Sequence, residues 1–167
     1  MESDEVEAEI QIALQGLCRD PGAHGWRNRE WTRRVKEAVG RVLSGRGHIL
    51  SSSSRVGSAW LWDGVALERD ASGNLVMVRL ALESEWMGKA EIKYDFEKLL
   101  AARAEHRVMV FSAESRRGVE TQVKRLRAMI AAFRQGQSGD RYLLAGWYGK
   151  GRSPGAFIFA CLRVGPH

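Results

Sequence analysis

Residues 75–86 constrain the fold most, because their side chains alternate in the manner of a long β-strand. Alternate residues of a strand share one face of the sheet. One face of this segment is apolar and must meet a core: Val76, Val78, Leu80 and Leu82. The opposite face becomes charged at its end, where Glu83 and Glu85 point the same way, roughly 6–7 Å apart. The segment therefore predicts a strand that packs on one side and ends in two carboxylates.

Helical and strand patterns alternate along the rest of the chain. Apolar residues recur at helical spacing in four segments, residues 3–17, 28–43, 95–104 and 117–135, with Asp95 as the cap of the third. Further strands are expected at residues 59–63, 107–112, 142–148 and 156–164, a hairpin turn at 70–74, and a loop or strand edge at 51–54. Strands separated by helices favour an α/β fold with a mixed central β-sheet flanked by helices.

The length of 167 residues fits one compact domain, in which we expect residues 1–22 to form an N-terminal helical extension. Cys18 and Cys161 lie far apart without a partner motif, so neither a disulfide framework nor a cysteine zinc site is indicated. The N-terminus is acidic, and no segment approaches the roughly 20 apolar residues of a membrane span. These features predict a cytoplasmic protein without a membrane partner.

The charge of the chain is unevenly distributed. The net charge is +6, yet residues 1–10 contain five acids and neither Lys nor Arg, so the remainder carries +11. A basic body favours a polyanionic partner, because phosphates attract Lys and Arg through counterion release. Nucleic acid is therefore the expected partner, although many basic proteins bind none. The sequence leaves the oligomeric state open, a homodimer included.

Three carboxylates could meet at one end of the sheet. Asp63 closes one expected strand, and Glu83 and Glu85 close the strand that begins at residue 75. If these strands are neighbours, the acids converge, and clustered carboxylates usually hold a hard cation such as Mg²⁺ through oxygen ligands. The Ser84 carbonyl could complete the site. Solvated acids at strand ends are the alternative, and three nearby tryptophans argue against it: Trp60, Trp62 and Trp86.

The order of these residues resembles the restriction-endonuclease-like, or PD-(D/E)XK, nuclease superfamily. The resemblance covers roughly residues 31–112, and it rests on the succession of elements because the motif itself is short and degenerate. The segments that carry it are Trp60-Leu61-Trp62-Asp63, Leu80-Ala81-Leu82-Glu83-Ser84-Glu85-Trp86, Asp95-Phe96-Glu97-Lys98-Leu99-Leu100 and the strand 108–111. The resemblance implies a restriction-endonuclease-like core around the carboxylates.

The same resemblance implies roles for individual residues. Asp63 and Glu83 would be metal ligands, but Glu85 stands where the motif has a lysine. Lys98 on the following helix is the candidate for a displaced lysine, ahead of Lys93. A solvated Lys98 that merely pairs with Asp95, three residues away, is the other reading. Glu30 or Glu37 on the preceding helix could add an acid, although each is more typical of a helix surface.

These roles imply a metal-dependent nuclease that hydrolyses phosphodiester bonds of DNA or RNA through Mg²⁺ or Mn²⁺ held by Asp63 and Glu83. Glu85 or Lys98 would orient the attacking water. The glutamate in place of the motif lysine motivates a second hypothesis. In that reading the chain is a catalytically inactive nuclease-fold module that binds nucleic acid or a protein partner.

Overall fold

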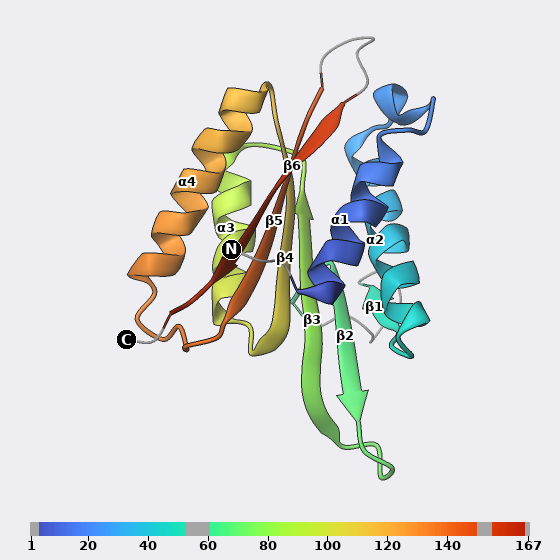
Figure 1. Cartoon of the computed structure of the whole chain (residues 1–167), viewed down its shortest axis with the longest axis vertical. Coiled ribbons are helices and arrows are strands. Elements are labelled where there is room, and N and C mark those ends of the chain that lie inside the picture. The colour runs from blue at the N-terminus through green and yellow to red at the C-terminus, as the bar shows by residue number, and fades with distance from the viewer. Residues whose placement is uncertain (1–3, 53–60, 150–154, 166–167) are drawn as a thin grey trace.

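The computed structural model describes residues 4–52, 61–149 and 155–165. In these ranges a six-stranded mixed sheet lies between two helical layers (Figure 1). The strands follow one another across the sheet in chain order: β1 (Leu50–Ser52), β2 (Gly64–Arg69), β3 (Leu75–Glu85), β4 (Ala104–Ala113), β5 (Arg141–Tyr148) and β6 (Ala156–Arg163). β3, β4 and β5 run parallel, and the other neighbours are antiparallel. The predicted α/β fold with a mixed sheet is confirmed.

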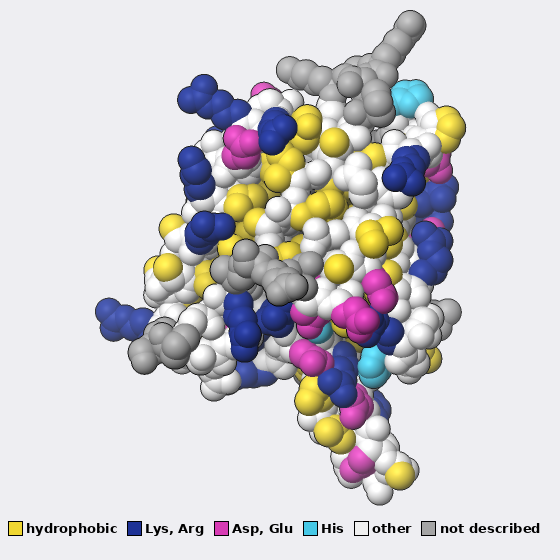
Figure 2. Space-filling view, viewed as in Figure 1, with side chains coloured by type: hydrophobic (Ala, Val, Ile, Leu, Met, Phe, Trp, Pro, Cys, Tyr) yellow, Lys and Arg dark blue, Asp and Glu magenta, His cyan; other side chains and the backbone are white. Residues whose placement is uncertain are grey.

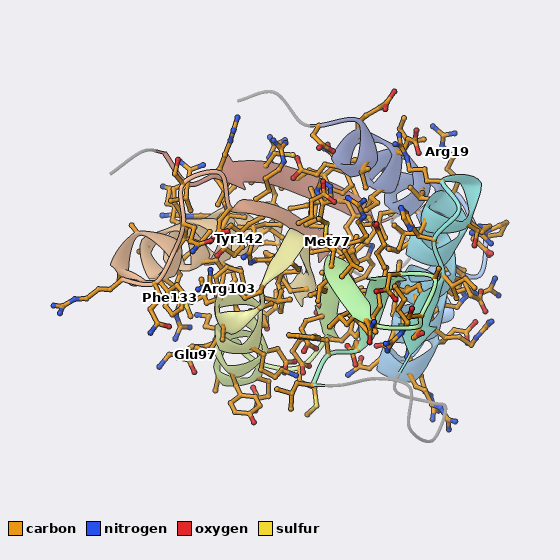
Figure 3. The ribbon with its side chains drawn as sticks, turned by 90° about the horizontal axis from the view of Figure 1, so that it is seen from below. Arg19, Met77, Glu97, Arg103, Phe133 and Tyr142 are labelled. Carbon is orange, nitrogen blue, oxygen red and sulfur yellow. The ribbon has the colours of Figure 1, made fainter. Side chains whose placement is uncertain are left out.

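Two helices cover each face of the sheet, as the end-on view in Figure 3 shows. α1 (Glu5–Leu17) and α2 (Asn28–Gly45) form one layer, joined by a short 3₁₀ helix, η1 (Ala23–Gly25). α3 (Lys89–Ala101) and α4 (Arg116–Ala132) form the other. Each layer closes its own apolar core, the first around Leu80 and Leu82 and the second around Phe96 and Met109. No helix in the described ranges is long and apolar enough to cross a membrane.

β3 is the predicted strand, but its apolar face changes side. Leu80 and Leu82 are fully buried under α1 and α2, whereas Val78 joins the core under α3 and α4. The pairing with β2 shifts between Leu80 and Val78, so Arg79 is an extra residue in the ladder. A single inserted residue reverses the alternation of side chains. The predicted continuous apolar face is therefore wrong beyond this bulge.

The outer end of the β2–β3 hairpin extends beyond the body of the molecule (Figures 1 and 2). β1 pairs only as far as Ala66, and β4 begins its pairing at Val78, so neither strand follows the hairpin to its tip. Val76, predicted to meet a core, is consequently 57% exposed. The predicted turn at residues 70–74 is present, with Asp70 accepting hydrogen bonds from the backbone amides of Ser72 and Asn74, each at 2.9 Å.

Two expected boundaries are wrong. α3 begins at Lys89 rather than at residue 95, because Gly88 caps it and Ile92 supplies the first buried position of the stripe that continues at Phe96. Asp95 is therefore an interior helix residue and not a cap. Of the strand expected at 59–63, residues 59 and 60 lie outside the described ranges, and residues 61–63 form no strand. Asp63 instead directly precedes β2, which the sequence did not indicate.

Substitution of Gly146 by alanine is expected to lower the free energy of unfolding by about 1–3 kcal/mol. A methyl group at this position on β5 would lie 2.2 Å from Val119 Cγ1 and 2.9 Å from Phe111 Cζ, both in fully buried side chains. Gly16→Ala in α1 is the control, because a methyl group there meets no atom within 4 Å. Since alanine favours a helix over glycine, this control should be neutral or stabilising in urea unfolding. Equal stability of the two variants would contradict the predicted clash.

Candidate functional site

The register of β2 and β3 brings Asp63 to the end of β3. The two strands are antiparallel with Gly64 opposite Leu82, so the residue before β2 lies beside the last residues of β3. The Ser84 backbone amide donates a hydrogen bond of 2.9 Å to Asp63 Oδ2, and the Ser84 hydroxyl lies 3.3 Å from the same oxygen. Asp63 therefore precedes a strand rather than closing one, and the antiparallel direction still places it beside the end of β3, where its charge acts on Glu83.

Glu83 is the most buried carboxylate of the candidate site, with only 1% of its surface exposed. Its side chain points towards α3, where the Lys98 ammonium lies 2.6 Å from Glu83 Oε1. The approach is a charge contact rather than a well-aligned hydrogen bond, because Oε1 has no hydrogen-bond partner among the described residues. Lys98 thus reaches Glu83 from the helix that follows β3.

Lys98 is held by three oxygen atoms. Besides Glu83, its ammonium lies 2.9 Å from Asp95 Oδ1 and donates a hydrogen bond of 3.2 Å to the Leu61 carbonyl. The pairing of Lys98 with Asp95 and the contact with Glu83 are therefore both present, and the two readings of the sequence do not exclude each other. Burial lowers the pKa of Lys98, but the contacts with Glu83 and Asp95 outweigh it, so the pKa lies above its usual value.

Burial raises the pKa of Glu83 to about 8. This pKa includes the effect of the Lys98 ammonium, which lowers it, and of the negative charges of Asp63 and Asp95, which raise it. A carboxyl group with this pKa changes its protonation near neutral pH, where an exposed glutamate is fully ionised. Such perturbed carboxyl groups are concentrated at functional sites, although structural ion pairs also produce them.

Glu85 lies at the end of β3 but has partners of its own. The Met87 backbone amide donates a hydrogen bond of 2.6 Å to Glu85 Oε1. Burial raises the pKa of Glu85, and the neighbouring Asp95 carboxylate adds to the rise. Asp95 is thus a fourth acid of the site, which the sequence analysis considered only as a cap and as a partner of Lys98.

Ser84 and Thr32 connect the site to the opposite helical layer. The hydroxyls of these two residues lie 3.1 Å apart, and the Trp86 indole donates a hydrogen bond of 3.0 Å to Thr32 Oγ1. The Trp86 ring is stacked on Trp31 of α2 with 5.1 Å between their centroids. Thr32 therefore fixes α2 against the end of β3. Nothing in the sequence indicated it, because a threonine inside an amphipathic helix is an ordinary surface residue.

Three weaker candidates do not join the site. Glu30 pairs with Arg33 and Arg34 on α2, and Glu37 pairs with Arg33. Lys93 of α3 faces Glu97 at 3.4 Å. These contacts are exposed pairs along a helix surface, which contribute little to stability.

The donor atoms at the site suit a hard cation, since Asp63, Glu83, Glu85 and Asp95 offer only carboxylate oxygens. Glu83 Oε1 is buried, and the Lys98 ammonium 2.6 Å away is its partner, so a cation would have to displace this ammonium. The carboxylates are nevertheless engaged separately, Asp63 with Ser84 and Glu83 with Lys98. Within the described ranges, no group of three or more His, Cys, Asp or Glu is already arranged around a metal position.

No family model, no curated protein and no solved structure matches the chain.

Proposed function

We propose that the chain is a metal-dependent nuclease-like hydrolase of phosphodiester bonds. The observation that carries the proposal is the buried Glu83 carboxylate, which has the Lys98 ammonium 2.6 Å away. The Asp63 carboxylate lies close by, because it accepts a hydrogen bond from the backbone amide of Ser84, the residue after Glu83. A buried carboxylate with a raised pKa destabilises the fold at neutral pH. A functional role accounts for its presence at the end of a central strand.

The succession of elements supports a restriction-endonuclease-like core. Asp63 stands directly before β2, Glu83 and Glu85 end the neighbouring β3, and Lys98 lies on the helix that follows. β4 then returns parallel to β3. This is the order of residues on which the resemblance rests, with Asp63 before a strand instead of at the end of one, and Lys98 would compensate for the glutamate at the motif's lysine position.

The residues have distinct roles in this proposal. Mg²⁺ or Mn²⁺ would polarise the scissile phosphate and lower the pKa of a bound water. Asp63 and Glu83 would hold the ion. Asp63 would then release Ser84, and Glu83 would release Lys98. Lys98, freed from Glu83, would orient the water or bind a phosphate oxygen. Asp95, one helical turn before Lys98, would keep the ammonium nearby, because Asp95 Oδ1 lies 2.9 Å from Lys98 Nζ.

A second candidate is a nuclease-fold module without catalysis. It is favoured by the separate engagement of the carboxylates and by the Lys98 ammonium, which already neutralises Glu83. Such a module would bind nucleic acid or a protein through its surface and would not depend on the carboxylates. The two candidates differ in whether divalent cations change what the protein does.

The test is cleavage of plasmid, single-stranded DNA and RNA with Mg²⁺, Mn²⁺ or EDTA. Asp63→Asn and Glu83→Gln should each lower the rate by about 10³-fold, because a metal-holding carboxylate supports several kcal/mol of charge stabilisation. Lys98→Met should lower it by about 10²-fold. Glu97→Gln on the same helix is the matched control and should cleave normally, because Glu97 contacts only Lys93 among the described residues.

The outcomes separate the two candidates. Cleavage that requires a divalent cation and is lost in the two carboxylate variants supports the enzyme. Absence of cleavage, together with no Mn²⁺ binding in calorimetry, rejects catalysis. Nucleic-acid binding that survives in all variants under those conditions favours the module.

A further inference from the structure

A large groove runs along α2 and reaches the candidate site. Its volume is about 1310 Å³, and Asp63 and Thr32 are among the residues that line it. Trp26, just before α2, lines it as well, and Ile49 and Leu50 lie on the side of β1. Pockets for small molecules are usually about 300–1,000 Å³. The groove is therefore large for a small ligand, and of the site's carboxylates it reaches Asp63.

Four cations in this groove lack a partner among the described residues. Arg33 also lines the groove but is neutralised by Glu30 and Glu37. The other four cationic side chains make no hydrogen bond or ion pair in the described part of the chain: Arg27, Arg29, Lys36 and Arg41. We call these four residues the α2 surface. Figure 2 shows Lys and Arg side chains gathered at the edge of the molecule that α2 forms.

The acidic N-terminal segment does not neutralise the α2 surface. Glu5 and Glu9 of α1 pair with Arg46 at the end of α2, at 3.1 and 2.8 Å. Glu7 is buried and pairs with Arg141. The described acids of the N-terminus are thus used elsewhere, and the unpaired cations along α2 remain available to an external anion.

The spacing of the cations fits a chain of phosphates rather than a single one. From Arg27 to Arg41 the α-helical rise of 1.5 Å per residue gives about 21 Å. One strand of DNA carries a phosphate about every 3.4 Å along a helix, so several phosphates match this length. The groove also offers apolar surface to bases, in the half-buried Trp26 and in Ile49, which is 78% exposed. Cations combined with aromatic side chains are typical of sites for single strands, and Trp26 is the aromatic side chain that lines this groove, with the Arg34 guanidinium 5.0 Å from its ring centroid.

We infer that the α2 surface binds single-stranded nucleic acid and directs it to Asp63. The inference rests on the proposed function in one respect, that the bound strand is the substrate. Binding itself requires no catalysis. A duplex lacks exposed base faces, so it would use the cations without the apolar side of the groove. Single-stranded DNA and RNA share the recognised chemistry.

The test measures fluorescence anisotropy of labelled oligothymidylate, oligouridylate and a duplex of equal length, in EDTA and at several salt concentrations. The variant is Lys36→Glu/Arg41→Glu. The matched control is Lys124→Glu/Arg127→Glu, which changes the charge equally on α4, where both side chains are exposed and unpaired among the described residues. Circular dichroism should show both pairs of substitutions to be folded, because neither pair lies in a core.

Binding of the single strands should be tighter than binding of the duplex. Lys36→Glu/Arg41→Glu should weaken it by at least about tenfold and lower the slope of log K against log salt by about 1.4, at about 0.7 per phosphate contact. The control should leave the slope unchanged. Equal weakening in both double variants, tighter binding of the duplex, or no binding at any salt would overturn the inference.

The outcomes also separate this inference from the proposed function. Binding that depends on Lys36 and Arg41, without cleavage under any cation, rejects the hydrolase and retains the α2 surface. Cleavage of a single strand that is unaffected by Lys36→Glu/Arg41→Glu rejects the α2 surface and retains the hydrolase.

Discussion

Substitution of Arg141 by methionine is expected to lower the free energy of unfolding by about 3–5 kcal/mol, because it leaves a buried charge without its partner. Glu7 is 1% exposed, and the Arg141 guanidinium donates hydrogen bonds of 3.0 and 2.7 Å to its two carboxylate oxygens. His106, with Nδ1 3.7 Å away, the Asp4 backbone amide and the Cys161 thiol would remain near the carboxylate, and none of them replaces the two hydrogen bonds of the guanidinium. Urea unfolding at neutral pH measures the loss.

Two further variants identify the cause of this loss. Glu7→Leu/Arg141→Met removes both charges and should recover most of the stability, as replacement of buried ion pairs by apolar side chains often does. Arg46→Met breaks exposed pairs with Glu5 and Glu9 and should cost at most about 1 kcal/mol. An Arg141→Met variant as stable as the wild type would show that the buried pair does not hold α1 on the sheet.

The Glu7–Arg141 pair also predicts that the free energy of unfolding falls at acid pH. Burial raises the pKa of Glu7, but the neighbouring His106 ring and the hydrogen bonds from Arg141 outweigh this effect and hold the pKa at about 2. Because the pKa in the folded state lies below the usual 4.5, the stabilisation is complete above 4.5 and is lost as the pH falls towards 2. Arg141→Met should flatten the dependence of stability on pH in this window.

Glu83→Gln is expected to gain stability relative to the wild type as the pH rises from 4.5 to about 8. The pKa of Glu83 is raised in the folded state, so the folded wild type binds a proton more tightly than the unfolded chain does. Its stability therefore falls across this window by about 1.4 kcal/mol per pH unit and is lowest above it. Glutamine does not titrate, so the variant lacks this fall.

Urea unfolding of both proteins in EDTA, below and above this window, tests the prediction. EDTA excludes a bound cation that would keep the carboxylate ionised. Glu97→Gln, at an exposed pair with Lys93, should follow the wild type at every pH. Parallel curves for Glu83→Gln and the wild type would show that the Glu83 carboxyl is ionised throughout and does not destabilise the fold at neutral pH.

Much of the fold could be predicted, because it depends on local patterns. The alternation after residue 75 predicted β3, the Asp70 and Gly73 signals predicted the hairpin turn, and the helical periodicity predicted α2 and α4. The bulge at Arg79 could not be predicted, because it depends on pairing between β2 and β3. The start of α3 was misplaced because Asp95 has the residue type of a cap, whereas the buried Ile92 extends the helix by two turns.

The candidate site was predictable where it follows from strand register or from the resemblance. Strand register brings Asp63 to the end of β3 near Glu83. The resemblance led us to expect Lys98 near Glu83. Asp95 and Thr32 were missed because they lie on helices, and their contact with the site depends on how each helix is rotated against the sheet. The Glu7–Arg141 pair joins residues 134 positions apart, which no local pattern records.

The outer end of the β2–β3 hairpin has no other strand beside it, and this affects how the length of the sequence can change. Because the two strands run antiparallel, equal numbers of residues can be removed or added on both sides of Gly73. The pairs between Val78 and the body of the sheet then keep their register. Asp63 and Glu83 would stay opposite each other whatever the reach of the hairpin. We therefore expect the hairpin to tolerate insertions and deletions at its tip without a change in the positions of Asp63 and Glu83.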